Sequence, residues 1–391
     1  MAIELEKKDR QYFENRKRRY KRMLTFLILS LLIIAAFAIA FFIYQQKNIY
    51  YTDYILIDST ERSDGSYTNY LSYNKGILRY SKDGAMAMDF KGNSVWNSTY
   101  DMHNPMVDIC GEYVVISDKG NKSLELINEA GHVKSLEVLY PIIKAEVANQ
   151  GVVAVIMDGG DENYIQFFSP TGKNLVDSRT IVEEDGFPVD FSLSRDGQKF
   201  VTSYISISAG LIQSKVTFYN FGAVGQNYEA RVVGGFDYGQ TLISKVEFIN
   251  NDTVCVFGDD KFSIYDMEEI PKLTFEEPFE TEVKSISFDE DHIGIIKKRI
   301  EGNGQYNLKV YDRQGDTILN EDISYNYNKF SISKEELVFF SDTELNILRL
   351  KGKEKFNTTF EQHISHVFPM TFQDEYLIID NSKISRIKLI K

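Results

Sequence analysis

Few side chains in this sequence stand at spacings that would support chemistry. His363 and His366 form an H-x-x-H pair, but no third metal ligand is evident near them. We interpret both as ordinary polar residues at the start of a strand. The acidic run at residues 158–162 lacks the alternating ligands and terminal glutamate of a helix-loop-helix calcium site, and we interpret it as a solvated turn. We therefore expect no bound metal and no cofactor.

Motifs of nucleophilic, phosphate-binding and redox enzymes are also missing. The sequence contains no G-x-S-x-G, no G-x-x-x-x-G-K-[ST], no H-E-x-x-H and no C-x-x-C. Cys110 and Cys255 lie in separate apolar runs, where buried free thiols are expected. We expect a protein that is not an enzyme. The alternative is a hydrolase or lyase acting on carbohydrate through Asp or Glu residues that the sequence cannot position.

One segment is apolar enough to cross a membrane. Residues 23–44 are 22 residues without a charge, which as a helix would extend about 33 Å. In the linker that follows, residues 45–52, Lys47 is the only charged residue. The positive-inside rule then predicts a cytoplasmic basic tail at residues 1–22 and an extracytoplasmic domain at residues 53–391. The basic residues that set this orientation are Arg16, Lys17, Arg18, Arg19, Lys21 and Arg22.

A cleaved signal peptide is the competing interpretation of this segment. Ala38-Ile39-Ala40 has the small-residue pattern that precedes a cleavage site. The apolar run continues through Phe41, Phe42 and Ile43, beyond that pattern, and is longer than the apolar part of a signal peptide. We therefore predict an uncleaved single-pass anchor that contacts membrane lipid through residues 23–44.

The two ends of the chain differ in charge. Residues 1–22 carry 9 Lys and Arg against 4 Asp and Glu, whereas the remainder carries 35 against 53, a net charge of −18. An acidic domain repels nucleic acid, so we expect no nucleic-acid partner. We interpret the basic tail as a topology signal. Transmembrane sensing, which would need an inner partner for this tail, is a further alternative.

The region after Tyr51 is built from short apolar runs that recur in groups. Runs of four to eight residues rich in Val, Ile, Phe and Tyr are separated by Gly, Asp and Asn. Five of the groups carry a turn in which a core residue is followed, four positions later, by a glycine able to take positive φ. The turn recurs at residues 88–92, 127–131, 168–172, 311–315 and 348–352. Eight such units of about 42 residues fit the length of four-stranded propeller blades.

A single four-stranded sheet cannot bury both of its faces, so successive units must stack around an axis. We predict an all-β protein, a β-propeller of eight four-stranded blades, with seven blades or a two-sheet sandwich as alternatives. The last unit contains only three strands. We predict that residues 53–59 supply the missing outer strand and close the ring, because otherwise two sheet edges would stay free.

The fourth unit is the longest and holds two segments that we predict as loops, residues 206–214 and 234–240. Both are predicted on the face away from the membrane. Long loops with glycine and aromatic residues on a rigid scaffold are typical recognition sites. The candidate partner contacts are Leu211, Ile212, Phe236, Asp237 and Tyr238. The alternative is that Phe236 and Tyr238 plug the opening at the ring axis.

Two resemblances support the fold. Residues 87–92, followed by Val95-Trp96, resemble the repeat of quinoprotein-like propellers, in which aspartate starts the turn, glycine completes it and tryptophan docks between blades. The cysteine pair and metal surroundings of quinone enzymes are absent. The anchor with residues 218–222, 224–227 and 233–236 resembles a family of unknown function of membrane-anchored Firmicutes proteins. This resemblance implies a membrane-anchored WD40-like propeller and supplies no activity.

Together these patterns predict a binding or scaffold protein of the cell envelope. We expect its partner to be an envelope protein or a cell-wall component. The anchor and the repeat ring support this hypothesis, which sequence motifs do not narrow further.

Overall fold

The computed structural model describes residues 2–62, 68–299, 304–333, 335–370 and 374–391. The chain divides into two compact units, one ending at Tyr51 and one spanning Thr52–Ile390. The first unit is a helix, and the second consists almost entirely of strands.

Helix α1 (Ala2–Lys47) contains the predicted membrane span and the basic cluster in front of it. Within α1, the stretch Arg16–Ile39 is long and apolar enough to cross a membrane by its length and composition. An anchor and a signal sequence both satisfy this criterion near an N-terminus. The helix therefore agrees with either interpretation of the apolar run.

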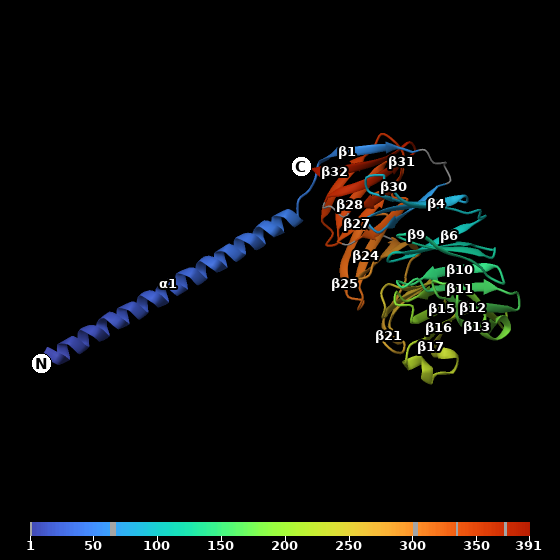
Figure 1. Cartoon of the computed structure of the whole chain (residues 1–391), viewed down its shortest axis with the longest axis horizontal. Helices are drawn as coiled ribbons and strands as arrows, with labels where there is room; N and C mark the ends of the chain where they lie inside the picture. Colours follow the sequence, from blue (N-terminus) through green and yellow to red (C-terminus); the bar gives the residue numbers. More distant parts are fainter. Residues whose placement is uncertain (1, 63–67, 300–303, 334, 371–373) are drawn as a thin grey trace. The chain divides into compact units, whose positions relative to one another are not determined.

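The second unit consists of eight antiparallel sheets of four strands each (Figure 1), which confirms the prediction of an eight-bladed propeller. Blade one contains β2 (Asn69–Tyr73), β3 (Gly76–Tyr80), β4 (Gly84–Asp89) and β5 (Ser94–Thr99). Blade two contains β6 (Pro105–Cys110), β7 (Tyr113–Asp118), β8 (Ser123–Asn128) and β9 (Gly131–Glu137). Blade three contains β10 (Ile142–Val147), β11 (Val153–Asp158), β12 (Glu162–Phe168) and β13 (Asn174–Ile181). Blade four contains β14 (Phe187–Leu193), β15 (Lys199–Ser208), β16 (Leu211–Asn220) and β17 (Val232–Gly239).

The remaining blades repeat the pattern. Blade five contains β18 (Ile243–Phe248), β19 (Thr253–Gly258), β20 (Lys261–Asp266) and β21 (Lys272–Pro278). Blade six contains β22 (Val283–Phe288), β23 (His292–Lys298), β24 (Tyr306–Asp312) and β25 (Thr317–Ile323). Blade seven contains β26 (Lys329–Ser333), β27 (Glu336–Phe340), β28 (Glu344–Arg349) and β29 (Glu354–Thr359). Blade eight contains β30 (Ile364–Pro369), β31 (Glu375–Asp380), β32 (Lys383–Ile390) and β1 (Asp53–Glu61). Short helices α2 (Val182–Asp185), η1 (Val224–Asn227) and η2 (Glu229–Arg231) lie in connections.

Blade eight joins the two ends of the ring. Strand β1 pairs antiparallel with β32, with Asp53 opposite Ile390 and Glu61 opposite Lys383 (Figure 1). Tyr54 on β1 also packs against the rings of Phe356 and Phe360, at centroid distances of 6.3 and 5.4 Å. The first strand of the ring is thus held by the last strand of the chain and by the neighbouring blade.

The turn glycines also allow neighbouring blades to approach each other. Gly315 ends the β24–β25 turn with φ of +89°, a conformation that only glycine adopts at little cost. A Cβ atom at Gly315 would come within 2.3 Å of the Phe275 ring on β21. The predicted turn residue therefore completes its own blade and makes room for the outer strand of the preceding one.

The core lies between blades rather than inside any one of them. One cluster joins Trp96 and Leu78 of blade one to Val114 and Ile116 of blade two. Others join blade four to blade five and blade six to blade seven in the same way. Because each blade buries its faces against two neighbours, no blade has a core of its own. Trp96 occupies the position between blades that the quinoprotein-like repeat implies.

The ring has two faces. The hairpin face carries the turns between the second and third strands of each blade and the connections between blades. The entry face carries the other turns and the start of β1, since Asp53 lies opposite Ile390 at the end of β32.

Candidate functional site

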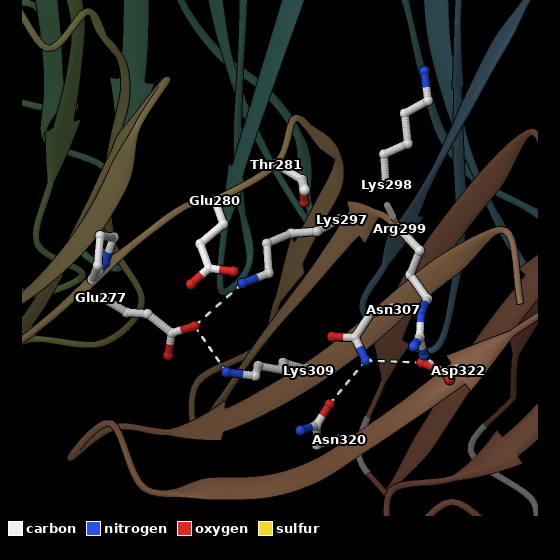
Figure 2. Close-up of a pocket in the computed structure, with 11 residues that line it drawn as sticks. Glu277, Glu280, Thr281, Lys297, Lys298, Arg299, Asn307, Lys309, Asn320 and Asp322 are labelled. Carbon is white, nitrogen blue, oxygen red and sulfur yellow. Dashed lines mark hydrogen bonds and ion pairs between the residues drawn. The ribbon is translucent and has the colours of Figure 1, made fainter. Parts of the chain in front are cut away.

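A polar pocket of about 740 Å³ lies between the outer strand of blade five and blade six. Figure 2 shows its side chains, which come from the end of β21, the connection after it, strands β23, β24 and β25, and Arg299 directly after β23. The lining residues are Glu277, Pro278, Glu280, Thr281, Lys297, Lys298, Arg299, Asn307, Lys309, Asn320 and Asp322. Every one of them except Pro278 carries a polar or charged side chain, so the pocket suits a hydrophilic ligand.

Glu277 is the centre of one wall of this pocket. Its Oε1 accepts hydrogen bonds from Lys309 Nζ at 2.9 Å and from Lys297 Nζ at 3.3 Å (Figure 2). Its Oε2 accepts from the hydroxyl of Tyr311, whose side chain is buried, at 2.8 Å. Phe275, two residues earlier on the same face of β21, packs on the Tyr311 ring. The alternation of β21 thus turns both residues towards blade six.

These contacts determine the protonation of the site. Burial would raise the pKa of Glu277, but the hydrogen bonds from Lys309 and Tyr311 outweigh it and hold that pKa below its ordinary value of 4.5. Burial, followed by the hydrogen bond to Glu277, raises the pKa of Tyr311 above its ordinary value. At neutral pH the wall therefore presents a carboxylate clamped by two ammonium groups, which has no proton to donate.

The opposite wall is a second polar network. Asn307 Nδ2 donates to Asn320 Oδ1 at 2.9 Å and to Asp322 Oδ1 at 3.2 Å, and Arg299 forms an ion pair with Asp322. In contrast, Glu280, Thr281 and Lys298 make no side-chain hydrogen bond or ion pair with another described residue. Figure 2 shows Lys298 extending away from the paired groups. The pocket can therefore offer donors and acceptors to a polar ligand, while its main charges neutralise one another.

Sequence reasoning did not identify this pocket. Glu277 lies 20 residues from Lys297 and 32 from Lys309, so their contact depends on the packing of two blades. The alternation of Phe275 and Glu277 indicates which way the strand faces, but not which side chains it meets.

The predicted contact residues of blade four do not form a loop, which corrects the prediction. Residues 234–239 belong to β17, the outer strand, with Val216 opposite Phe236 and Lys215 opposite Asp237. The side chain of Tyr238 is buried and its hydroxyl lies 2.8 Å from that of Tyr265. Phe236 packs against the Tyr265 ring at 4.8 Å. These two aromatic residues pack against blade five and do not project from the ring, whereas Asp237 is exposed.

Leu211 and Ile212 lie elsewhere, on a hairpin formed by β15 and β16. The segment predicted as a loop continues as paired strands, with Ile207 opposite Ile212 and Ser208 opposite Leu211. Ile207 is 79% exposed, Leu211 49% and Ile212 54%. The structure therefore separates the five predicted residues into an exposed hairpin tip and an outer strand that is partly buried.

Three carboxylates on innermost strands bond to the backbone of the next blade. Asp108 on β6 accepts from Val147 N at 2.8 Å, and Glu146 on β10 accepts from Leu193 N at 2.7 Å. Asp190 on β14 accepts in the same way from Val246 N at 3.0 Å. Each innermost strand is a sheet edge whose N–H groups need acceptors. These acidic residues provide them.

A lysine balances part of this axial charge. Lys144 Nζ lies 2.7 Å from Glu146 and 2.6 Å from Asp190. Burial opposes the charged form of Lys144, but these two carboxylates outweigh it and raise its pKa. Burial, followed by the charge of Glu146, raises the pKa of Asp108 from its ordinary 3.8 to about 7.

Asp108→Asn should alter how stability depends on pH. Because the folded-state pKa is raised, the natural protein loses stability as pH rises from about 4 through about 7, while the Asn variant keeps an acceptor for Val147 and cannot ionise. We expect the variant to gain about 1–2 kcal/mol relative to the natural protein over this range, less than the full pKa shift implies, because residue Asp108 keeps some exposure to solvent. Urea unfolding of both proteins at several pH values measures this difference. A difference that does not vary with pH would contradict the raised pKa.

The other sequence candidates have separate environments. His363 Nε2 lies 3.4 Å from Asp342, whereas His366 Nε2 lies 3.1 Å from Lys329 Nζ, so the two imidazoles have different partners. Asp158 Oδ1 accepts from Gly160 N within the acidic turn. Within the described residues, no group of three His, Cys, Asp or Glu side chains could hold a metal ion. Cys110 and Cys255 are free and buried.

Comparison with known structures agrees with the propeller fold. The chain is similar to BamB from Moraxella catarrhalis, with a TM-score of 0.52 and 12% identity, covering 86% of this chain and 100% of that one. It is also similar to apo AztD from Citrobacter koseri, with a TM-score of 0.50 and 10% identity, covering 76% and 87%. At these identities the likeness concerns the fold alone.

Sequence comparisons assign the chain to a family. A search of curated proteins gives no significant match. The model of a family of unknown function, DUF5711, matches residues 45–389, which include the whole ring except β32's final residue.

Proposed function

We propose that this chain, which belongs to the DUF5711 family, is a membrane-anchored propeller that binds a partner protein outside the cytoplasm and catalyses no reaction. The asymmetry of charge around the apolar helix supports this orientation. Six basic residues lie directly before the apolar span of residues 23–44, whereas the linker after it contains one basic residue. With an uncleaved anchor, this asymmetry keeps the tail inside and the ring outside.

The observation that carries the proposal is the hairpin of blade four. On one side, β15 pairs with β14 only as far as Ile205. On the other side, the pairing of β16 with β17 reaches only to Ser214. In the described part of the chain, residues 206–213 therefore extend beyond both flanking strands and pair only with each other. Three aliphatic side chains at this tip, Ile207, Leu211 and Ile212, are exposed. Apolar side chains held on a protruding, regular element are suited to insertion into a partner.

The surroundings of the tip indicate the chemistry of that partner. Residues 203–214 carry no charge, whereas Glu183 and Glu184 on α2 are exposed, and α2 contacts β15. A partner that fits would offer an apolar cleft bordered by basic residues. An anionic membrane surface fits less well, because an acidic ring is repelled by it.

The alternative functions receive less support. A carbohydrate-active enzyme would need axial carboxylates that are free to act, whereas Asp108, Glu146 and Asp190 accept backbone N–H groups. Glu247 on β18 is paired with Lys245 at 2.8 Å. A transmembrane sensor would need an inner partner for residues 1–22, and nothing in the structure identifies one.

A photocrosslinking residue at position 211 tests the proposal in intact cells, with position 175 as the matched control. Leu211 and Leu175 are both 49% exposed, but Leu175 lies at the start of β13, beside the entry face. We expect one protein adduct from position 211 and none from position 175. Adding Ile207→Ser and Ile212→Ser should reduce that adduct about tenfold, because two apolar anchors are lost. Equal adducts from both positions would refute the interface.

A thiol at position 212 tests the location separately. A membrane-impermeant maleimide should label Ile212→Cys in intact cells, against little background from the buried Cys110 and Cys255. Labelling only after lysis would show that the ring faces the cytoplasm, whatever the hairpin binds.

A further inference from the structure

A second cavity, of about 560 Å³, lies along the innermost strands of four consecutive blades. It is lined mainly by residues of β2, β22, β26 and β30, which belong to blades one, six, seven and eight, together with Asn328 before β26 and Phe340 at the end of β27. It is therefore distinct from the pocket of Figure 2 and from the hairpin of blade four. Nothing in the proposed partner interface uses it.

The charge of this cavity is opposite to that of the ring. No Asp or Glu is among the described residues that line it, although residues 23–391 together carry a net charge of −18. Its basic side chains are Lys329 and His366, whose Nζ and Nε2 atoms are 3.1 Å apart. Within the described chain, Lys329 forms no ion pair with a carboxylate. The exposed Lys329 ammonium group thus lies at the wall of a cavity that is open to solvent, and no described carboxylate pairs with it.

The protonation of these groups agrees with an uncompensated positive field. Burial lowers the pKa of Lys329 below its ordinary value. Burial, followed by the charges of Lys329 and Arg62, lowers the pKa of His366 to about 4. At neutral pH His366 is therefore uncharged and accepts a hydrogen bond from the Lys329 ammonium. An anion in the cavity would stabilise that ammonium group.

Aromatic rings and hydroxyl groups complete the walls. The His366 ring stacks on Phe368, with centroids 5.9 Å apart, and meets the Tyr70 ring edge-on at 5.3 Å. Ser72 and Ser331 line the same space, and their hydroxyls have no partner in the described part of the chain. The cavity therefore combines one cation, free hydroxyl donors and flat apolar surface.

We propose that this axial cavity binds a small organic anion, in which an acidic group meets Lys329 and the serine hydroxyls while an apolar ring or chain lies against the aromatic residues. A neutral molecule of the same shape would leave the ammonium group without a counter-ion. Discrimination between charged and neutral forms is thus the expected signature of the site.

Isothermal titration of the full chain in nanodiscs tests this with 2-naphthoate and its uncharged analogue 2-naphthamide. We expect one naphthoate per chain and an affinity about tenfold or more above that of the amide. A third probe, 2-naphthyl phosphate, distinguishes a carboxylate ligand from a phosphate ligand by which of the two binds more tightly. Naphthoate and naphthamide binding equally would overturn the proposal.

Two lysine variants locate the site. Lys329→Gln should weaken naphthoate binding about tenfold while leaving naphthamide binding unchanged, and Lys329→Arg should retain most of it. Lys284→Gln is the matched control, because Lys284 lies on β22 but its ammonium group packs over Tyr306 and Tyr327 and does not line the cavity. Naphthoate binding that is unchanged in Lys329→Gln would refute the assignment.

Discussion

Cysteines introduced at Ser59 and Ser385 are expected to form a disulfide that raises the free energy of unfolding by about 3–5 kcal/mol. Ser59 lies on β1 and Ser385 on β32, directly opposite each other in the antiparallel ladder. Their Oγ atoms are 3.3 Å apart. Opposite residues of antiparallel strands have the Cα separation that a disulfide requires. No other change tests the closure of the ring as directly.

The size of this effect follows from the length of chain that the bond encloses. Residues 59 and 385 are 326 positions apart, so the bond removes much of the freedom of the unfolded ring. Strain and residual structure in the unfolded chain reduce the ideal gain, which sets the lower end of the range. The measurement is the urea midpoint of the oxidised double variant against the same protein after reduction.

Single variants provide the controls for this experiment. Ser59→Cys and Ser385→Cys alone should unfold like the natural protein, because both sites are at least partly exposed and Cys110 and Cys255 are buried. A double variant that stays reduced under oxidising conditions, or that links only between molecules, would mean that β1 does not pair with β32.

The architecture of the ring could be predicted because it depends on local signals that repeat. Each predicted turn at Gly92, Gly131, Gly172, Gly315 and Gly352 has its glycine at positive φ. The apolar runs before these turns are the second strands of their blades, such as Val153–Asp158 and Glu336–Phe340. Because the same turn signal recurs in several blades, a wrong assignment in one unit does not change the predicted fold.

The outer strand of blade four shows where local signals mislead. The segment Gly234–Gly239 contains three glycines in six residues, and glycine favours loops when a segment is considered alone. Here the strand is held by Phe236 and Tyr238, which pack on or bond to Tyr265 of blade five. The stabilising contacts come from a different blade, and no pattern within residues 234–239 contains them.

The candidate sites were missed for a related reason. The polar pocket depends on side chains from blades five and six, and the axial cavity on strands from four blades. Of the residues that line the axial cavity, only His366 belongs to a motif considered in the sequence. Its imidazole contacts Lys329 and not His363. Spacing along the chain predicts the blades, whereas the register between blades determines which charges meet.

Glu277→Gln is expected to destabilise the ring by about 2 kcal/mol at neutral pH. The substitution keeps the shape of the side chain but removes the charge that holds Lys297 and Lys309. The glutamine has a single acceptor oxygen, which can face either the two lysines or Tyr311, while its NH₂ group faces the other side. Either the buried Tyr311 hydroxyl or both ammonium groups therefore lose their acceptor. Urea unfolding at pH 7 measures the loss.

Glu280→Gln is the control within the same pocket, because Glu280 is exposed and has no side-chain partner among the described residues. It should change the free energy of unfolding by less than about 0.5 kcal/mol.

The contribution of Glu277 to stability depends on pH in one direction. Since the pKa of Glu277 is lowered, its contribution is present above about 4.5 and is lost as pH falls through the folded-state value. The difference in unfolding free energy between the natural protein and Glu277→Gln should therefore shrink in acid. If Glu277→Gln and Glu280→Gln had equal effects at pH 7, the contacts of Lys297 and Lys309 would not stabilise the interface between the blades.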